Sequence, residues 1–221
     1  MSSTEKLSVD REGIGFAVVG RSGDNAGSPF AGMKIRSLKP NVSQEEAIAQ
    51  FQASGPVGWI RSTAIGPLRS VAAAYLPFQL FRVAISNQGQ TEERLLGVDA
   101  VTGTLDLFQF ERIPGDGEMI WVDTRNCPGV QLDEERLGGL LESKVRRMLY
   151  SKGFFRMKEL RIVPEPVSIE LHIPYWLGFR GAGGEARLSV IDAVRRRPEG
   201  AKVRALFENW LLSCGGHSSG I

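Results

Sequence analysis

The sequence predicts an α+β fold made of two tandem α-β-β-β units with antiparallel sheets, followed by a C-terminal helix. Three observations predict it: a pattern that occurs twice, a helical segment before each copy, and short apolar runs separated by turn residues after each helix. The chain has 221 residues, of which 42% are hydrophobic, so it is long enough to bury a core.

The repeat aligns two segments at an offset of 97 residues, which falls to 93 after a gap. Residues 75–78 (YLPF) lie over residues 172–175 (HIPY), and further along residues 98–101 (VDAV) match residues 191–194 (IDAV). Each copy of a duplication must fold as one supersecondary unit that finds a partner face. We therefore divide the chain into a partly flexible leader (1–40), a first repeat (41–115), a second, diverged repeat with the C-terminal helix (130–214) and a tail (215–221).

The first unit contains one helix and a small meander. In the leader before it, the apolar run 14–19 predicts one strand. Ser43 and Glu46 have the spacing of a capping box, in which each side chain accepts a hydrogen bond from the other residue's backbone N–H. Strands are expected at 80–85 and 94–98, joined by a polar hairpin loop, and a third strand at 104–110.

The second unit begins with a stronger helix. Its apolar residues recur at helical spacing, with acidic residues at the start and basic residues near the end: Leu137, Leu140, Leu141, Val145, Met148 and Leu149. Four strands are expected to follow, at 160–163, 167–173, 176–180 and 186–191, with a glycine-rich hairpin connection at 181–184. A final helix carries Val203, Leu206, Phe207, Trp210 and Leu211 on one face, and we expect it to pack across a sheet.

The end of the first unit has a specific turn sequence. The segment Val98-Asp99-Ala100-Val101-Thr102-Gly103-Thr104-Leu105 resembles the last strands of the PepSY domain, which carry a similar Val-Asp-Ala-x-Thr-Gly-x-Val/Leu signature. From the residues themselves, Asp99 can accept hydrogen bonds from turn amides while Gly103 takes a positive φ. The match is best over 41–110. In the second copy, over 133–194, Arg195 and Arg196 stand in place of Thr-Gly.

The PepSY resemblance implies a small α+β binding or regulatory module. Some members of that family inhibit a peptidase, and the family supplies no catalytic residues to carry over. PepSY domains are commonly exported or attached to membranes, whereas this sequence shows no signal segment and no long apolar stretch. We therefore expect a cytoplasmic protein without a membrane partner, and the peptidase-inhibitor role is disfavoured.

Composition excludes several classes of function. The net charge is +2, which is too close to zero to indicate a polyanionic partner, so the sequence disfavours nucleic acid. The two cysteines, Cys127 and Cys214, form no CxxC pair and are expected to be free thiols. The two histidines cannot form a metal site alone. We expect no metal and no cofactor.

Two groups of side chains are candidates for a ligand or partner surface. Phe78, Tyr175 and Trp176 lie at or beside equivalent points of the two copies, and either pack in the core beneath a helix or form a recognition surface. Arg195, Arg196 and Arg197 form either a cationic patch for phosphate or acidic side chains or a solvated turn.

Three functions follow from these features. The first is a non-enzymatic cytoplasmic protein-binding or scaffolding module, with a protein partner or self-association into a homo-oligomer. The second is an enzyme or small-ligand binder whose site forms between the repeats from Asp99, Asp192, Arg187 and Tyr175. The third is binding of an anion or nucleic acid through the Arg195–Arg197 turn, which would depend steeply on salt.

Overall fold

The computed structural model describes residues 32–52, 66–151, 159–181 and 187–215. The expected strand at 14–19, most of the glycine-rich connection at 181–184 and most of the tail lie outside the described residues. Within them, the helices pack on one mixed sheet of eight strands, which confirms the α+β class. The expected tandem units would each have their own sheet, but the described strands form a single sheet.

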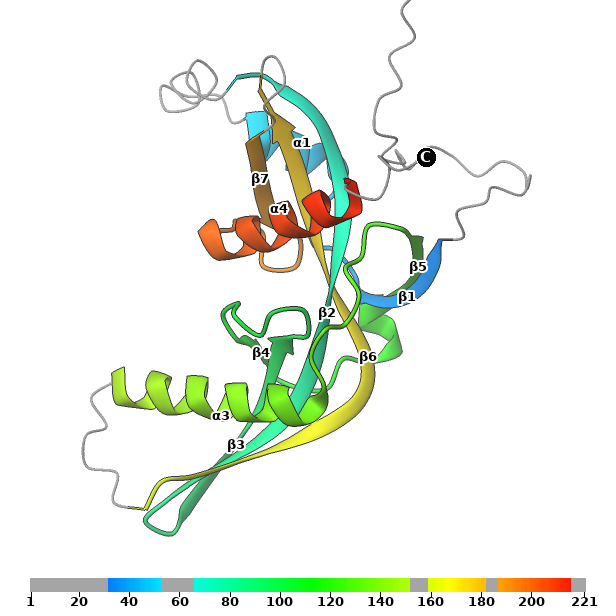
Figure 1. The fold of residues 1–221 in the computed structure, drawn as a ribbon. Coiled ribbons are helices and arrows are strands. Elements are labelled where there is room, and N and C mark those ends of the chain that lie inside the picture. Colours follow the sequence, from blue (N-terminus) through cyan, green and yellow to red (C-terminus); the bar gives the residue numbers. More distant parts are fainter. Residues whose placement is uncertain (1–31, 53–65, 152–158, 182–186, 216–221) are drawn as a thin grey trace, which may run out of the picture.

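Two very long strands form the spine of the molecule (Figure 1). β2 (Leu68–Asn87) and β6 (Arg161–Arg180) each have 20 residues, and they pair antiparallel from Leu68 opposite Arg180 to Ser86 opposite Arg161. The three strands expected between 160 and 180 are therefore one. Pro164, Pro166 and Pro174 lie between the expected runs, but a proline can remain extended within a strand and only lacks the N–H donor.

The register of this pair places the two copies of the repeat against each other. Leu76 lies opposite Ile173, its equivalent in the repeat, while Tyr75 lies opposite Pro174 and Pro77 opposite His172. Exchanging each residue for its equivalent reproduces the same pairs, so an approximate two-fold axis passes through the Leu76–Ile173 pair.

The remaining strands attach to the edges of this spine. β3 (Gln90–Asp99) pairs with β2 across a tight turn in which Gln88 and Gly89 have positive φ, and this confirms the expected hairpin. The other strands are β4 (Phe108–Phe110) on β3, β7 (Arg187–Asp192) on β6, β8 (Arg197–Pro198) on β7, β1 (Met33–Leu38) parallel to β6, and β5 (Met119–Thr124) antiparallel to β1.

Three of these strands differ from the sequence-based expectation. β4 has three residues instead of the expected run 104–110, because a turn built on Asp99 occupies the first part of that run. β1 lies in the expected leader, and β5, preceded by the 3-10 turn η1 (Asp116–Glu118), lies between the two expected units. Both therefore belong to the sheet and not to a linker.

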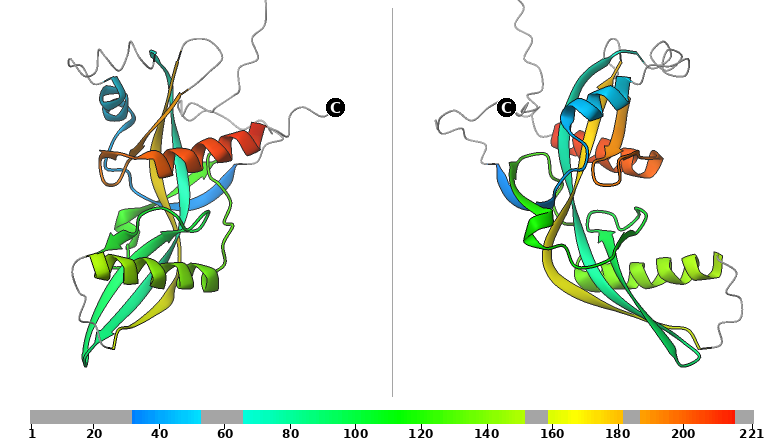
Figure 2. Two further views of the ribbon diagram at one scale, coloured as in Figure 1. Left: turned by 60° about the vertical axis from the view of Figure 1, so that its left-hand side comes forward. Right: turned by 180° about the vertical axis from the view of Figure 1, so that it is seen from behind.

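The two halves of the chain exchange their helices (Figures 1 and 2). α1 (Gln44–Gln52) comes from the first half, and its Phe51 belongs to a buried cluster with Ile191 of β7 and Trp176 of β6. α3 (Glu134–Ser151) comes from the second half and packs its buried leucines on the β2–β3 hairpin and on the first residues of β6. Each helix therefore covers the hairpin of the other half.

Backbone hydrogen bonds fix this exchange at both helix entrances. The Asn41 N–H donates to the Ala193 carbonyl at 2.7 Å, and the Gln131 N–H donates to the Ala100 carbonyl at 2.9 Å. Ala100 and Ala193 are equivalent in the repeat, and each donates its own N–H to a proline carbonyl of the spine. The same polar contacts thus occur twice, once in each half.

The first turns of α1 and α3 are capped by side chains. Ser43 Oγ accepts from the Glu46 N–H at 3.2 Å and Glu46 Oε2 accepts from the Ser43 N–H at 2.8 Å, which confirms the capping box. Asp133 Oδ1 accepts from the Arg136 N–H at 2.8 Å.

The C-terminal helix closes the opposite face of the sheet. α4 (Ala201–Gly215) buries Val203, Leu206 and Phe207 in a core that also contains Leu76 and Phe78. Strand alternation along β2 directs Leu76, Phe78 and Leu80 into the core with α4, and Phe81, Val83 and Ile85 into the core with α3. The expected packing of this helix across a sheet is confirmed.

Replacing Gly178 by alanine should loosen the packing of α1 on the half that it covers. A Cβ atom at Gly178 would lie 3.0 Å from the ring of Phe51, which is closer than van der Waals contact allows. We expect Gly178→Ala to lower the free energy of unfolding by about 1–3 kcal/mol, measured by denaturant unfolding.

A second substitution makes this test specific. Phe51→Leu should restore part of the loss in the Gly178→Ala background, because the smaller side chain leaves room for the new methyl group. Additive effects of the two substitutions would contradict the contact between α1 and the second half.

Candidate functional site

Two buried aspartates define the turns that follow the hairpin strands. Asp99 is fully buried, and its Oδ1 accepts from the Thr102 N–H at 2.7 Å, the Thr102 hydroxyl at 2.9 Å and the Gly103 N–H at 2.9 Å. Its Oδ2 accepts from the Leu105 N–H at 2.9 Å. Gly103 has φ of +66°. Both expectations for this turn, the carboxylate contacts and the positive φ, are confirmed.

Asp192, the equivalent residue, is less well satisfied. Its Oδ1 accepts from the N–H groups of Val194 at 2.8 Å and Arg195 at 2.7 Å. Its buried Oδ2 accepts no hydrogen bond from any described residue, and the nearest cation is Arg195, whose Nε lies 3.8 Å away. Burial raises the pKa of Asp192, although the two amides and the guanidinium of Arg195 oppose that shift.

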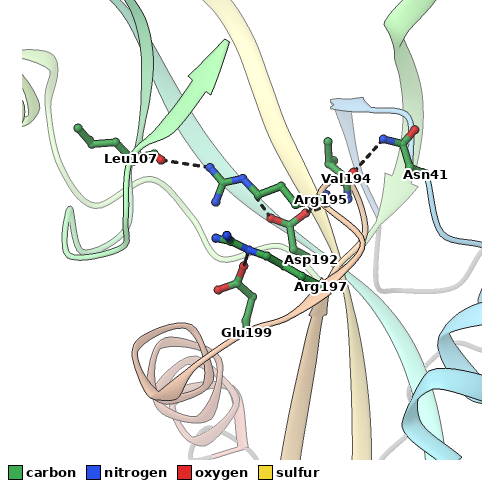
Figure 3. A network of polar contacts seen from close by, with 7 residues as sticks. All are labelled: Asn41, Leu107, Asp192, Val194, Arg195, Arg197 and Glu199. Carbon is green, nitrogen blue, oxygen red and sulfur yellow. Dashed lines mark hydrogen bonds and ion pairs between the residues drawn. The ribbon is translucent and has the colours of Figure 1, made fainter. Parts of the chain in front are cut away.

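Arg195 joins the two halves of the protein at this point. Figure 3 shows its side chain reaching from the turn after β7, over Asp192, to the carbonyl of Leu107, to which it donates at 3.1 Å. Its guanidinium also lies 3.7 Å from the centre of the Phe108 ring. One cation therefore holds the segment before β4 against the turn before α4.

A cavity of about 270 Å³ opens beside Arg195. It lies between the segment before β4 and the first turn of α4. The residues that line it are Leu105, Asp106, Tyr175, Arg195, Glu199, Gly200, Ala201, Lys202 and Val203.

Tyr175 is the most deeply buried polar residue of the cavity. It is 3% exposed and packs edge-to-face on Phe207, with ring centroids 5.5 Å apart. Its hydroxyl forms no hydrogen bond with any residue that the structure describes. Burial raises the pKa of Tyr175 well above its ordinary value, and the nearby carboxylate of Asp192 raises it further. The phenol is therefore a neutral hydrogen-bond donor at physiological pH.

The charged side chains of the cavity form pairs of opposite sign. Lys202 Nζ donates to Asp106 at 3.0 Å, and both side chains are mostly exposed. Glu199 accepts from Arg197 at 3.3 Å (Figure 3), and burial raises the pKa of Glu199. The cavity thus has an exposed ion pair at its rim and a buried phenol inside.

The structure brings together only some of the residues that the sequence suggested. Tyr175 and Arg195 line the cavity, Asp192 lies behind Arg195, and Arg197 contacts the lining through Glu199. Asp99 lies buried at the base of its own turn, where its carboxylate is fully used.

Four of the suggested residues lie elsewhere. Phe78 is a core residue, 4% exposed. Trp176 lies on the opposite face beneath α1 and donates to the Val42 carbonyl at 2.9 Å. Arg187 is exposed at the far end of the β6–β7 pair, and Arg196 forms an ion pair with Glu46.

Two of the groups that the sequence suggested as alternatives are not brought together. Asp99, Asp192, Arg187 and Tyr175 do not line a common cleft, because the first two carboxylates are committed to turn amides and Arg187 lies on the far end of its strand. The three arginines of the turn do not form one patch, because each guanidinium extends to a different carboxylate: Asp192, Glu46 and Glu199.

Sequence reasoning missed Lys202, Glu199 and the start of α4. One signal was present: the segment before this helix offers Gly200 where the other helices have Ser43 or Asp133, and its first turn holds no acidic residue. The sequence does not show that the segment before β4 lies opposite this turn, because Leu105 and Gly200 are 95 positions apart.

No protein-family model matches this chain, and no match was found among curated proteins or solved structures. The PepSY resemblance therefore stays a prediction. Within the described ranges, no helix has both the length and the apolar character needed to cross a membrane. The same residues contain no group of three His, Cys, Asp or Glu side chains arranged to hold a metal ion.

Replacing Asp192 by asparagine should alter stability in a pH-dependent way. Burial raises the pKa of Asp192 above 3.8 in the folded state, so the protonated carboxyl stabilises the fold. This stabilisation is fully present below pH 3.8 and is lost as the pH rises through the pKa of the folded state. Asparagine does not titrate. We expect Asp192→Asn to cost about 1 kcal/mol at pH 4 and less at pH 8, measured by denaturant unfolding at both pH values.

The exposed Asp123 provides the matched control. Asp123→Asn removes one carboxylate from the surface of β5 and should leave the fold intact. A penalty for Asp192→Asn that grows with pH would show that the native state prefers ionised Asp192, contrary to this description.

Proposed function

We propose that this protein is a non-enzymatic binding module that takes a small polar molecule into the cavity between its two halves. The observation that carries the proposal is Tyr175, which lines the cavity, is only 3% exposed as a residue, and has a hydroxyl without a hydrogen-bond partner among the described residues. A ligand in the cavity could accept a hydrogen bond from this phenol in place of water. A volume of about 270 Å³ lies just below the usual range of ligand pockets, so the ligand would be small.

Of the three functions that the sequence leaves open, small-ligand binding has the most support. Protein binding through the aromatic set has less, because Phe78 and Tyr175 are buried and Trp176 is partly covered by α1. Binding of nucleic acid through the arginine turn also has less, because these arginines pair with carboxylates of the same chain. A neutral Tyr175 is suited to orienting a ligand and not to removing a proton from it.

We further propose that the two halves derive from one duplicated PepSY-like unit. Supporting this are the pairing of Leu76 with its equivalent Ile173 and the equivalent placement of Asp99 and Asp192, each at the end of a hairpin strand. A cytoplasmic location remains part of the proposal.

Ligand binding can be tested by thermal unfolding in the presence of small polar compounds. The probes are a panel of carboxylates, phosphates, amines and sugars, each added to the full chain. A compound that binds only the native state raises Tm with its concentration. We expect at least one class of compound to do so, and Tyr175→Phe to weaken its binding about three- to ten-fold, because one hydrogen bond is lost.

Two alanines of α4 locate the site. Ala201 lines the cavity, whereas Ala205 is an exposed residue one turn further along the helix and does not line it. Ala201→Phe should abolish the rise in Tm by filling the cavity, and Ala205→Phe should preserve it. A panel without any effect on the wild type, or a rise in Tm that survives Ala201→Phe, would overturn the proposal.

A further inference from the structure

The first turn of α4 differs from those of the other two helices. α1 and α3 have their first N–H groups accepted by Ser43 and Asp133, but Gly200 has no side chain to do this at the start of α4. No side chain of a described residue accepts from the N–H groups of Ala201, Lys202 or Val203. These groups leave a partial positive charge at the cavity, because the first N–H groups of a helix have no acceptor within it.

Tyr175 supplies a second and independent indication of a ligand. Its phenol is 3% exposed, lines the same cavity and can donate one hydrogen bond that no described residue accepts. It comes from β6, so a strand and a helix terminus both present unused donors to one space. A group that accepts hydrogen bonds and carries negative charge would satisfy both.

The charged residues of the lining limit how much negative charge can enter. Arg195 and Lys202 contribute two positive charges, and Asp106 and Glu199 contribute two carboxylates. Asp106 is neutralised by Lys202, which lowers the pKa of Asp106, and Glu199 is paired with Arg197. The excess of donors comes from uncharged N–H and O–H groups, and this favours one oxyanion over a polyanion.

We infer that the cavity binds a small molecule through a single oxyanion, a carboxylate or a phosphate, held between the first turn of α4 and the hydroxyl of Tyr175. This inference rests on the proposed function and adds the chemical class of the ligand. Arg195 and Lys202 flank the site, and the exposed Lys202 can reorient from Asp106 toward the bound anion.

Gly200 offers a direct test, because a side chain at this position would compete with the anion for the N–H groups at the start of α4. A Cβ atom at Gly200 would meet no atom within 4 Å, so substitution should not disturb the fold. Asparagine or aspartate at this position can accept hydrogen bonds from the first turn of α4. We expect Gly200→Asn and Gly200→Asp both to raise Tm and to weaken anion binding at least ten-fold. Because asparagine caps the helix without adding a charge, the Gly200→Asn variant shows how much of the effect on Tm and on anion binding comes from capping alone.

The probes are sodium acetate and inorganic phosphate, titrated into the ¹⁵N-labelled full chain. We expect the amide signals of Ala201, Lys202 and Val203 to shift with saturation, and sodium chloride at equal ionic strength not to reproduce the shift. Saturation by acetate but not phosphate, or the reverse, identifies which oxyanion is preferred. Gly117→Asp, at an open position away from the cavity, controls for the added charge.

Each outcome distinguishes this inference from the proposed function. If neither anion shifts these amides beyond the chloride control, or if Gly200→Asn leaves anion affinity unchanged, the oxyanion site is overturned. If a neutral or cationic compound nevertheless raises Tm and loses that effect in Ala201→Phe, ligand binding in the cavity stands without the anion. If no compound binds at all, both proposals fail.

Discussion

The pairing of β2 with β6 is the interaction on which the rest of this structure depends. It joins the two halves over almost the full length of both strands, from Leu68 opposite Arg180 to Ser86 opposite Arg161. The β2–β3 and β6–β7 hairpins and the three helices lie toward its two ends, and β1 with β5 joins it near the middle, where Ser37 lies opposite His172 (Figure 2). Because Leu76 lies opposite its equivalent Ile173, the ribbon also imposes the approximate two-fold relation that makes each helix cover the opposite hairpin.

Local signals in the sequence predicted the elements that local contacts determine. The capping box at Ser43, the turn built on Asp99, and the helices α3 and α4 all depend on residues within a few positions of one another. The exchange of helices and the fusion of three expected strands into β6 depend on pairing between segments far apart in the chain, which propensity and periodicity do not encode. β5 (Met119–Thr124) begins with an apolar run, but it has no counterpart in the repeat and pairs with β1, which lies far from it in the sequence.

The candidate site follows from a difference between two equivalent turns. Asp99 is satisfied by four hydrogen bonds from its own turn, whereas Asp192 receives two and leaves one buried oxygen beside Arg195. Arg195 stands where the first copy has Thr102, and it bridges to Leu107 and Phe108 of the other half. The sequence suggested Tyr175 and Arg195 for separate reasons. Only the fold places them on one cavity, together with the uncapped start of α4.

The central claim is that the two halves cannot fold without each other, and dividing the chain tests it most directly. Residues 1–114 and 115–221 can be expressed separately and together, with cooperative unfolding followed by circular dichroism. Each fragment alone lacks the helix that covers its hairpin and one strand of the central ribbon. We expect neither to unfold cooperatively by itself, and a one-to-one mixture to regain a cooperative transition. A cooperative transition in either isolated fragment would show that the halves are independent tandem units and would contradict the exchange of helices.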